Sequence, residues 1–303
     1  MSPSPPSTLP SSSTRSFSLS DLALLSVVVI WGTNYTVVKE SLDTIPALAF
    51  MALRFGLAAL AMGALLLWLE GWQPLPRATF LRLAGLGLLG NTLYQICFML
   101  GMSHTTAANS GMLAAVTPVL VTVLAGALGL DRITRPIVVA LVLAVPGMLL
   151  VVSSRGPDLS AETRLGDLLI LAGSLCWALY TVGLRTLEPG LSALRVTAVT
   201  MITGAPGVVL VGLPAVARLE TESIGLGAWA GLVYSALIPL VLSYFIWNRS
   251  VQQVGSSRTS LYNTGIPVVA ALTSWAVRGE RPTLLQAAGT VLILSGVLIS
   301  RRR

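Results

Sequence analysis

Apolar residues form ten long runs along this chain, and short charged or Pro/Gly-containing breaks separate each run from the next. The runs are 19–39, 45–69, 79–101, 107–128, 134–153, 166–186, 191–213, 225–247, 257–278 and 283–301. A helix needs about 20 predominantly apolar residues to cross the hydrocarbon core of a bilayer. Stretches of about ten residues with alternating polarity, which typify outer-membrane barrels, do not occur. The pattern predicts an all-α integral membrane protein with ten transmembrane helices.

Composition supports the same class. The chain has 303 residues, of which 54% are hydrophobic and 10% charged, whereas a soluble domain carries about 25% charged residues. Residues 1–18 are rich in Ser and Pro and have no apolar core, so we expect a disordered cytoplasmic tail and not a signal peptide. Cys97 and Cys176 both fall inside apolar runs, where a disulfide is not expected.

The positive residues predict the orientation. With a cytoplasmic N-terminus, twelve Lys or Arg residues fall on the inner side and six on the outer side, as the positive-inside rule requires. Both termini are therefore expected in the cytoplasm, with the chain in the inner or plasma membrane. The net charge of +7 then reflects topology and contact with anionic lipids. No nucleic-acid partner is expected, because no basic domain lies outside the apolar runs.

Two parts of the sequence repeat. GMLAAVTPVLVTVLAGALGLDR (111–132) aligns with SLYNTGIPVVAALTSWAVRGER (260–281) at an offset of 149 residues, which pairs Pro118 with Pro267. DLALLSVVVIWGTNYTVVK (21–39) aligns with DLLILAGSLCWALYTVGLR (167–185) at an offset of 146. The chain therefore divides into 19–154 and 166–303, each with five predicted helices. Because five is odd, the two repeats must cross the membrane in opposite directions, which is the architecture of many secondary transporters.

The repeats also carry a family resemblance. The stretches WGTNYTVVKESL, ALRFGLAAL, TAANSGMLAAVTPVLVTVLAG and SSRTSLYNTGIPVVAALTSWAVRGER, together with the five-plus-five layout, resemble the EamA-type branch of the drug/metabolite transporter superfamily. The resemblance covers nearly the whole chain after residue 18. It implies a ten-helix carrier that exports amino acids or related metabolites, and in some members cationic drugs. Asp131 departs conservatively from the family pattern, which has Glu at this place, whereas Glu280 keeps it.

Aromatic residues lie in two kinds of place. One group lies near predicted helix ends, as interfacial aromatics do: Trp68, Trp72, Trp229, Trp247 and Trp275. A second group lies near mid-span: Trp31, Tyr94, Trp177, Tyr180 and Tyr234. Trp31 and Trp177 are equivalent positions of the two repeats. The second group either packs helices together or lines a cavity.

Helical spacing places several of these residues on shared faces with polar neighbours. Three such stripes are Trp31, Asn34, Tyr35 and Val38; Asn91, Tyr94, Gln95 and Phe98; and Trp177, Tyr180, Thr181 and Leu184. Polar stripes on membrane helices face the bundle interior or water. The stripes predict a central substrate-binding cavity with aromatic walls, which can stack an apolar or aromatic side chain or hold an organic cation.

Further candidates lie around this predicted cavity. Pro118 and Pro267 can kink the fourth and ninth helices and act as gating or hinge positions, unless these helices form only a packing seam. Asn109, Tyr262 and Asn263 are a second set of candidates for substrate contact or gating. Arg54 lies well inside the second run, where it serves a substrate carboxylate or a gate, or else reaches outward toward Glu40 or Asp43.

Mechanism and class follow from what the runs contain. No acid lies as deep as Arg54, and the single histidine, His104, is near a loop, so facilitated export is a simpler expectation than proton antiport. Motifs for metal hydrolases, nucleophilic hydrolases and NTPases are missing, so neither an enzyme nor a cofactor is expected. A multidrug or organic-cation exporter, a nucleotide-sugar-type carrier and a channel remain alternatives. The expected partners are a small-molecule substrate and membrane lipids, with a monomer as the working assumption.

Overall fold

The computed structural model describes residues 18–105, 113–114, 116–153, 163–188, 190–278 and 283–300, and these residues form helices with no β-strand. The α-helices are α1 (Leu19–Leu42), α2 (Ala47–Leu69), α3 (Arg77–Gly87), α4 (Tyr94–His104), α6 (Thr117–Ala127), α7 (Arg135–Ser153), α8 (Arg164–Gly183), α9 (Ala193–Ala217), α10 (Leu226–Ser235), α11 (Ser243–Val254), α12 (Ser256–Leu261), α13 (Ile266–Arg278) and α14 (Leu284–Ser300). Two π-helices, η1 (Leu88–Leu93) and η4 (Ala236–Leu242), join α3 to α4 and α10 to α11. Short 3₁₀ turns are η2 (Leu184–Thr186), η3 (Thr221–Ser223) and η5 (Tyr262–Gly265).

Within the described residues, six helical segments are long and apolar enough to cross a membrane. They are Leu19–Leu42, Ala47–Leu69, Arg77–His104, Arg164–Thr186, Ala193–Ala217 and Leu226–Val254. Shorter apolar helices cover Thr117–Ala127, Arg135–Leu150 and Leu284–Ile299. The chain is therefore a helical, multi-span membrane protein, whereas the count of ten spans stays a prediction.

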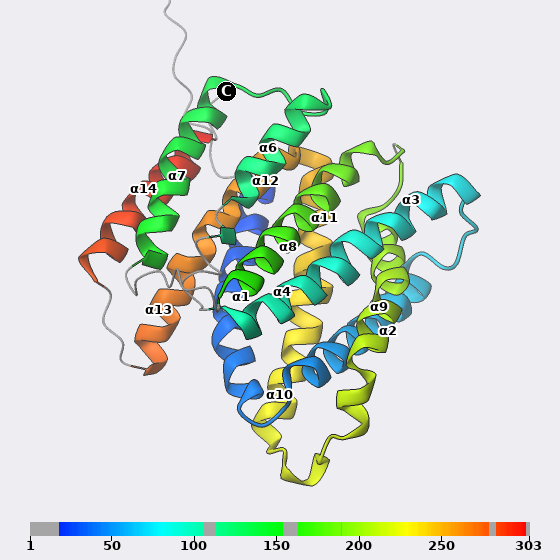
Figure 1. The fold of residues 1–303 in the computed structure, drawn as a ribbon. Coiled ribbons are helices and arrows are strands. Elements are labelled where there is room, and N and C mark those ends of the chain that lie inside the picture. Colours follow the sequence, from blue (N-terminus) through cyan, green and yellow to red (C-terminus); the bar gives the residue numbers. More distant parts are fainter. Residues whose placement is uncertain are drawn as a thin grey trace, which may run out of the picture.

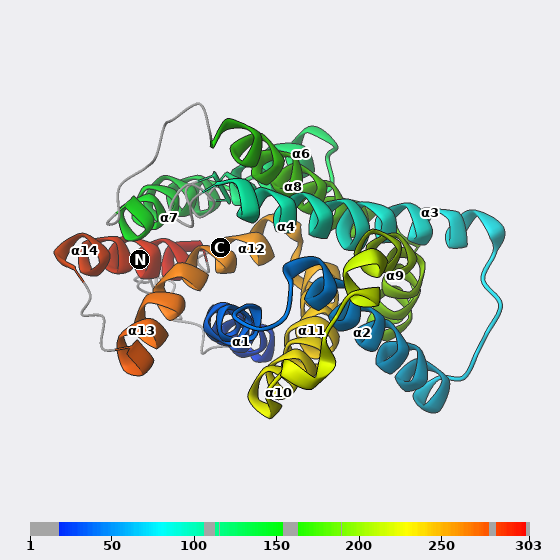
Figure 2. The same cartoon turned by 60° about the horizontal axis from the view of Figure 1, so that its bottom comes forward.

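The helices pack as a bundle of pairs (Figure 1). Helix α2 packs against α9, and α7 packs against α14; these two pairs lie at opposite sides of the bundle in both views (Figure 2). Between them, α4 packs against α8, and α1 contacts α10, α11 and α13. Residues far apart in the sequence therefore meet in the middle of the bundle, where α1, α4, α8 and α11 approach one another.

Large apolar side chains cover much of the outer surface. Leu60 is 74% exposed on α2, and Trp68 is 80% exposed near the end of the same helix. Trp72, in the connection that follows, is also exposed. Such exposure of contiguous apolar surface would be unfavourable in water, but it suits lipid contact. The positions of Trp68 and Trp72 are those expected of interfacial aromatics.

The eighth predicted run is wrong at its end. The run was expected to stop at residue 247, but the helix continues to Val254 and ends at Gly255, whose φ of 92° favours glycine. Residues 248–254 are mostly polar, although one side of this helical extension is buried. A hydropathy pattern alone therefore ends the helix too early. Trp247 is accordingly a fully buried residue and not an interfacial one.

Glycines allow two helices to cross closely beside the centre of the bundle. A Cβ atom at Gly87 of α3 would overlap the backbone carbonyl oxygen of Thr200 in α9, and one at Gly204 would approach the carbonyl oxygen of Gly87 to 2.5 Å. The two backbones therefore pass at a distance that only glycine permits, as small residues do at membrane helix interfaces. This crossing fixes the position of the third predicted span.

Candidate functional site

Seven aromatic side chains, which we call the ring cluster, meet where α1, α4, α8 and α11 approach. They are Trp31, Tyr94, Phe98, Trp177, Tyr180, Tyr244 and Trp247. The Trp177 ring lies at the centre, with centroid distances of 5.9 Å to Trp31, 5.0 Å to Tyr94 and 5.7 Å to Trp247. These tilted and edge-on arrangements are the favourable ones for aromatic pairs.

The predicted equivalence of Trp31 and Trp177 thus has a structural counterpart, since the two rings touch edge to face at an interplanar angle of 73°. Trp31 is held in place by a 3.0 Å hydrogen bond from its Nε1 to the carbonyl oxygen of Pro239. Pro239 lies in the π-helix η4. A π-helical turn disturbs the regular backbone bonding, and such turns occur often at functional sites.

Hydrogen bonds orient one side of the ring cluster. The Tyr180 hydroxyl donates to Asn248 Oδ1 at 2.9 Å, and Asn248 Nδ2 donates to Thr197 Oγ1 at 2.8 Å. Tyr180, Asn248 and Thr197 are all fully buried. These hydrogen bonds join α8, α11 and α9, so they hold the helices that carry the rings in fixed relative positions.

A polar group borders the ring cluster. Arg54 on α2 is only 7% exposed, and its Nη2 donates to Gln95 Oε1 at 3.3 Å. Gln95 Nε2 donates in turn to the Tyr244 hydroxyl at 3.3 Å. The guanidinium also lies 5.6 Å from the ring centroid of Phe50 and 6.0 Å from that of Phe55. These contacts are with Gln95, Phe50 and Phe55, and none of them is with Glu40 or Asp43, the outward partners considered from the sequence.

The residues of the predicted stripe on the third run have different neighbours, and their shared face stays a prediction. Asn91 turns to α9, where its Nδ2 donates to the carbonyl oxygen of Thr200 at 2.9 Å, whereas Tyr94 and Phe98 pack together at 5.8 Å. The π-helix η1 covers Leu88–Leu93 and therefore includes Asn91. A π turn has more residues than an α turn, so α-helical spacing does not carry a face assignment across it.

The remaining predicted residues are less closely grouped. Tyr35 is 46% exposed and makes no ring contact among the described residues. Tyr234 lies apart from the cluster, with its hydroxyl 3.5 Å from Thr33 Oγ1. Three candidates have buried polar atoms without a partner among the described residues: Asn34 Oδ1, Thr181 Oγ1 and Asn263 Oδ1. Asn109 lies outside the described residues.

The two prolines both stand at helix starts. Pro118 lies in the first turn of α6, and Pro267 is the second residue of α13, directly after the 3₁₀ turn η5. At a helix start, proline removes no helical hydrogen bond. Their role as gating or hinge positions stays a prediction.

A second polar group holds the start of α12, and we call it the α12 network. It comprises Asp21, Asp131, Arg185, Ser256, Ser257, Arg258 and Tyr262. Asp21 accepts hydrogen bonds from Arg258 Nη2 at 2.8 Å and from the Tyr262 hydroxyl at 2.7 Å. Tyr262, predicted for substrate contact or gating, therefore lies in this network and outside the ring cluster.

Asp131 forms the other half of the α12 network. It accepts from Ser256 Oγ at 2.7 Å and from the Ser257 backbone N–H at 2.8 Å, and it pairs with Arg185 Nε at 3.4 Å. Burial by itself would raise the pKa of this carboxyl group. The hydrogen bonds from Ser256 and Ser257 and the charge of Arg185 outweigh burial, and they hold the pKa of Asp131 below its ordinary value.

Sequence reasoning missed three residues of the site on α11. Tyr244 and Trp247 belong to the ring cluster, and Asn248 orients Tyr180. A signal was present: Tyr244, Trp247 and Asn248 follow α-helical spacing, and the offset of 149 pairs Gln95 with Tyr244. Extending the repeat alignment to the third and eighth runs would have found them.

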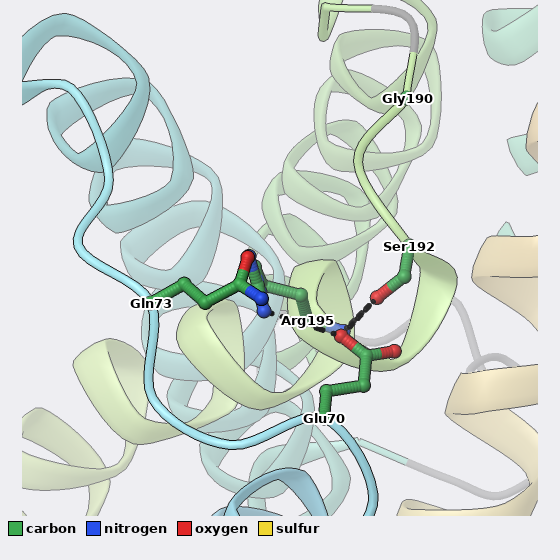
Figure 3. Close-up of a pocket in the computed structure, with 5 residues that line it drawn as sticks. All are labelled: Glu70, Gln73, Gly190, Ser192 and Arg195. Carbon is green, nitrogen blue, oxygen red and sulfur yellow. Dashed lines mark hydrogen bonds and ion pairs between the residues drawn. The ribbon is translucent and has the colours of Figure 1, made fainter.

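A shallow pocket of about 340 Å³ lies elsewhere, at the connection between α2 and α3 and the start of α9 (Figure 3). Arg195 pairs with Glu70 at 3.5 Å and donates to Gln73 Oε1 at 2.9 Å. Ser192 Oγ donates to Glu70 Oε2 at 2.8 Å. These side chains bond to one another, so the pocket is best explained as a polar contact that joins the α2–α3 connection to the start of α9.

A bundle of apolar helices around aromatic and polar side chains is typical of a membrane transport protein. The EamA-like transporter family model matches residues 18–153 and again 164–302, so the chain belongs to the EamA-like transporter family. "Uncharacterized transporter YyaM" of Bacillus subtilis is 30% identical over 281 residues, which cover 91% of this chain and 92% of that protein.

Two other relatives have more specific names. "Probable terminal-alkyne amino-acid exporter" of Streptantibioticus cattleyicolor is 27% identical, with 93% of each chain covered. "Probable amino-acid metabolite efflux pump" of Salmonella typhimurium is 28% identical, with 92% of this chain and 93% of that protein covered. A solved crystal structure superposes with a TM-score of 0.78 at 18% identity and covers 94% of this chain and 97% of that one, which shows that the fold is shared.

Proposed function

We propose that this protein exports small metabolites, namely amino acids with apolar or aromatic side chains, by alternating access through a central site at the ring cluster. The observation that carries the proposal is the meeting of Trp31, Trp177, Tyr94 and Trp247 from four different helices. Aromatic walls with few fixed charges suit an apolar or aromatic side chain. The relatives named as amino-acid exporters support the same substrate class.

Two inverted repeats are part of the proposal. The π-helices η1 (Leu88–Leu93) and η4 (Ala236–Leu242) occupy nearly equivalent places at the 149-residue offset. The helix pairs also correspond, since contact of α4 with α8 has its counterpart in contact of α11 with α1. In inverted-repeat carriers, the two halves rock against each other, and this movement exposes one site to each side of the membrane in turn.

The α12 network supports a closed state at one end of the bundle. With both termini in the cytoplasm, as the charge distribution predicts, the network lies on the cytoplasmic side. Asp21 and Asp131 come from the first half and hold α12 of the second half. We propose that inward opening requires these bonds to break, and that Tyr262 acts in gating and not in substrate contact.

The test is counterflow of radiolabelled L-phenylalanine, L-tryptophan and L-leucine in proteoliposomes that contain the purified protein. We expect saturable, stereoselective exchange, with loss of at least tenfold in Trp31→Ala, Tyr94→Ala and Trp177→Ala. Trp68→Ala is the matched control, because this Trp is 80% exposed. Unchanged exchange in all three cluster variants would remove the basis of the proposal, and single-channel currents would instead identify a pore.

The same vesicles test the coupling. Facilitated export predicts that exchange continues when an imposed pH gradient is collapsed while the amino-acid gradient is kept. Transport that stops on collapse of the pH gradient would establish proton coupling. One observation also separates the proposal from an organic-cation exporter: the buried cation at the ring cluster, Arg54, repels a cationic ligand.

A further inference from the structure

Arg54 is a buried cation without a described counter-charge. None of the ion pairs in the described part of the chain includes it, and its hydrogen bond to Gln95 is its only one there. An arginine has five N–H donors, of which the described residues accept from one. Its Nε is buried and without a partner among the described residues. An uncompensated charge inside a membrane protein is costly and typically marks a functional site.

A second unpaired donor lies in the ring cluster. Trp247 is fully buried, and its Nε1 has no partner among the described residues. Trp247 is one helical turn from Tyr244, whose hydroxyl accepts from Gln95. Arg54 is thus connected to the rings through two hydrogen bonds, and both unpaired atoms are donors. Unpaired donors together with a buried positive charge favour an anionic acceptor.

We propose that Arg54, supported by Gln95 and Tyr244, binds the carboxylate of the transported substrate while the ring cluster holds its apolar part. The guanidinium is the group best suited to a carboxylate because its planar fork can donate two parallel hydrogen bonds. The cation–π contacts with Phe50 and Phe55 hold the guanidinium in place. This inference rests on the proposed function, and it names the chemical group that the site selects.

The inference also assigns a lesser role to the substrate amine. Among the described residues, the buried acid is Asp21, which is bound by Arg258 and Tyr262 in the α12 network. None of the described carboxylates is bonded to Arg54, Gln95 or a residue of the ring cluster, so none is assigned to an ammonium group there. The site should recognise aryl carboxylates with or without an amine and should reject aryl amines.

Competition against L-tryptophan counterflow tests this selectivity. N-acetyl-L-tryptophan keeps the carboxylate and removes the amine charge, whereas L-tryptophanamide keeps the amine and removes the carboxylate. In the wild type, we expect the first to compete and the second to be at least tenfold weaker, as a lost charge-assisted pair implies. In Arg54→Gln, we expect an apparent KM raised about tenfold or more, with the difference between the competitors abolished.

Two further variants control for trivial causes. Arg54→Lys keeps the charge without the fork and should lie between the wild type and Arg54→Gln. Arg249→Gln removes one positive charge at an exposed position of α11 and should behave as the wild type. The wild-type competition requires no variant, so misfolding of Arg54→Gln cannot hide the answer. Equal competition by the amide and the acid, or discrimination that survives in Arg54→Gln, would overturn the inference and leave amino-acid export standing.

A binding measurement separates this inference from the proposed function. Indole-3-propionate should raise the melting temperature of the detergent-purified wild type, whereas tryptamine should not, and Arg54→Gln should lose the response. If no amino acid is exchanged but this pattern holds, the amino-acid proposal fails and the carboxylate site stands. If neither exchange nor stabilisation by the carboxylate occurs, both are wrong.

Discussion

Asp131→Asn should release the start of α12. The carboxylate of Asp131 accepts from Ser256 Oγ at 2.7 Å and from the Ser257 backbone N–H at 2.8 Å. Asparagine has nearly the same size and keeps one carbonyl oxygen, but it has no charge. The substitution therefore weakens both hydrogen bonds and removes the ion pair with Arg185 without creating a cavity. We expect the protein to fold and the proposed closed state at the α12 end of the bundle to lose stability relative to the open one.

The magnitude follows from the geometry. Hydrogen bonds to a charged group contribute about 1.5–3 kcal/mol, against about 0.5–1.5 kcal/mol for neutral ones. The Asp131 side chain is only 9% exposed, so screening there is weak, but Arg185 is 30% exposed and its ion pair adds little. Two weakened bonds give about 2–3 kcal/mol. At about 1.4 kcal/mol per factor of ten, the ratio of open to closed molecules should rise by roughly 30- to 150-fold.

Distances between two spin labels measure this ratio. Labels on cysteines introduced at the exposed positions Arg132 and Arg249, with Cys97 and Cys176 changed to Ser, report the distance between the loop after α6 and α11. The distribution in Asp131→Asn should shift toward a longer, second distance. Asp43→Asn is the matched control, because it removes an exposed acid outside the network. Identical distributions in wild type and Asp131→Asn would refute the assigned role of the α12 network.

Three other outcomes are expected. Gly87→Ala should lower the melting temperature, since its Cβ would overlap backbone in α9, whereas Gly85→Ala, with no atom within 4 Å, should not. Trp31→Phe keeps a ring but loses the hydrogen bond to Pro239, so counterflow should show a several-fold higher KM with little change in expression or stability. The spin-label distances should be constant from about pH 5 to 8. Because the pKa of Asp131 is lowered in the folded protein, the stabilisation by its carboxylate is complete above the unfolded pKa of 3.8. This stabilisation is lost only as pH falls through the lower, folded pKa.

Much of the fold was predictable because helices in lipid must satisfy their own backbone hydrogen bonds. Long apolar runs therefore have essentially one solution, and their order along the chain sets the layout. The mid-span positions of Trp31 and Trp177 were informative for a related reason. An indole away from the membrane interface needs a partner inside the bundle, and here Trp31 has one in the carbonyl oxygen of Pro239.

The π-helices limited how far the contacts of individual residues could be predicted from sequence. Within η1 and η4, the turn is wider than the α-helical spacing assumed from sequence, so that spacing could not show that Asn91 bonds to α9. Trp247 was misplaced for a different reason. Hydropathy ended the eighth run at residue 247 because polar residues follow, but these residues pack beside α12 and stay helical to Val254.

The geometry of α12 bears on the gating role that we propose for its start. The helix has only six residues, Ser256–Leu261, and Gly255 precedes it with a φ of 92°. The 3₁₀ turn η5 follows it, and then Pro267 near the start of α13. Breaks in the regular α-helical geometry at both ends separate this short helix from α11 and α13. Because bonds from Asp21 and Asp131 reach this helix from the other half of the chain, the gating proposal predicts that breaking them opens this end of the bundle while the ring cluster keeps its packing.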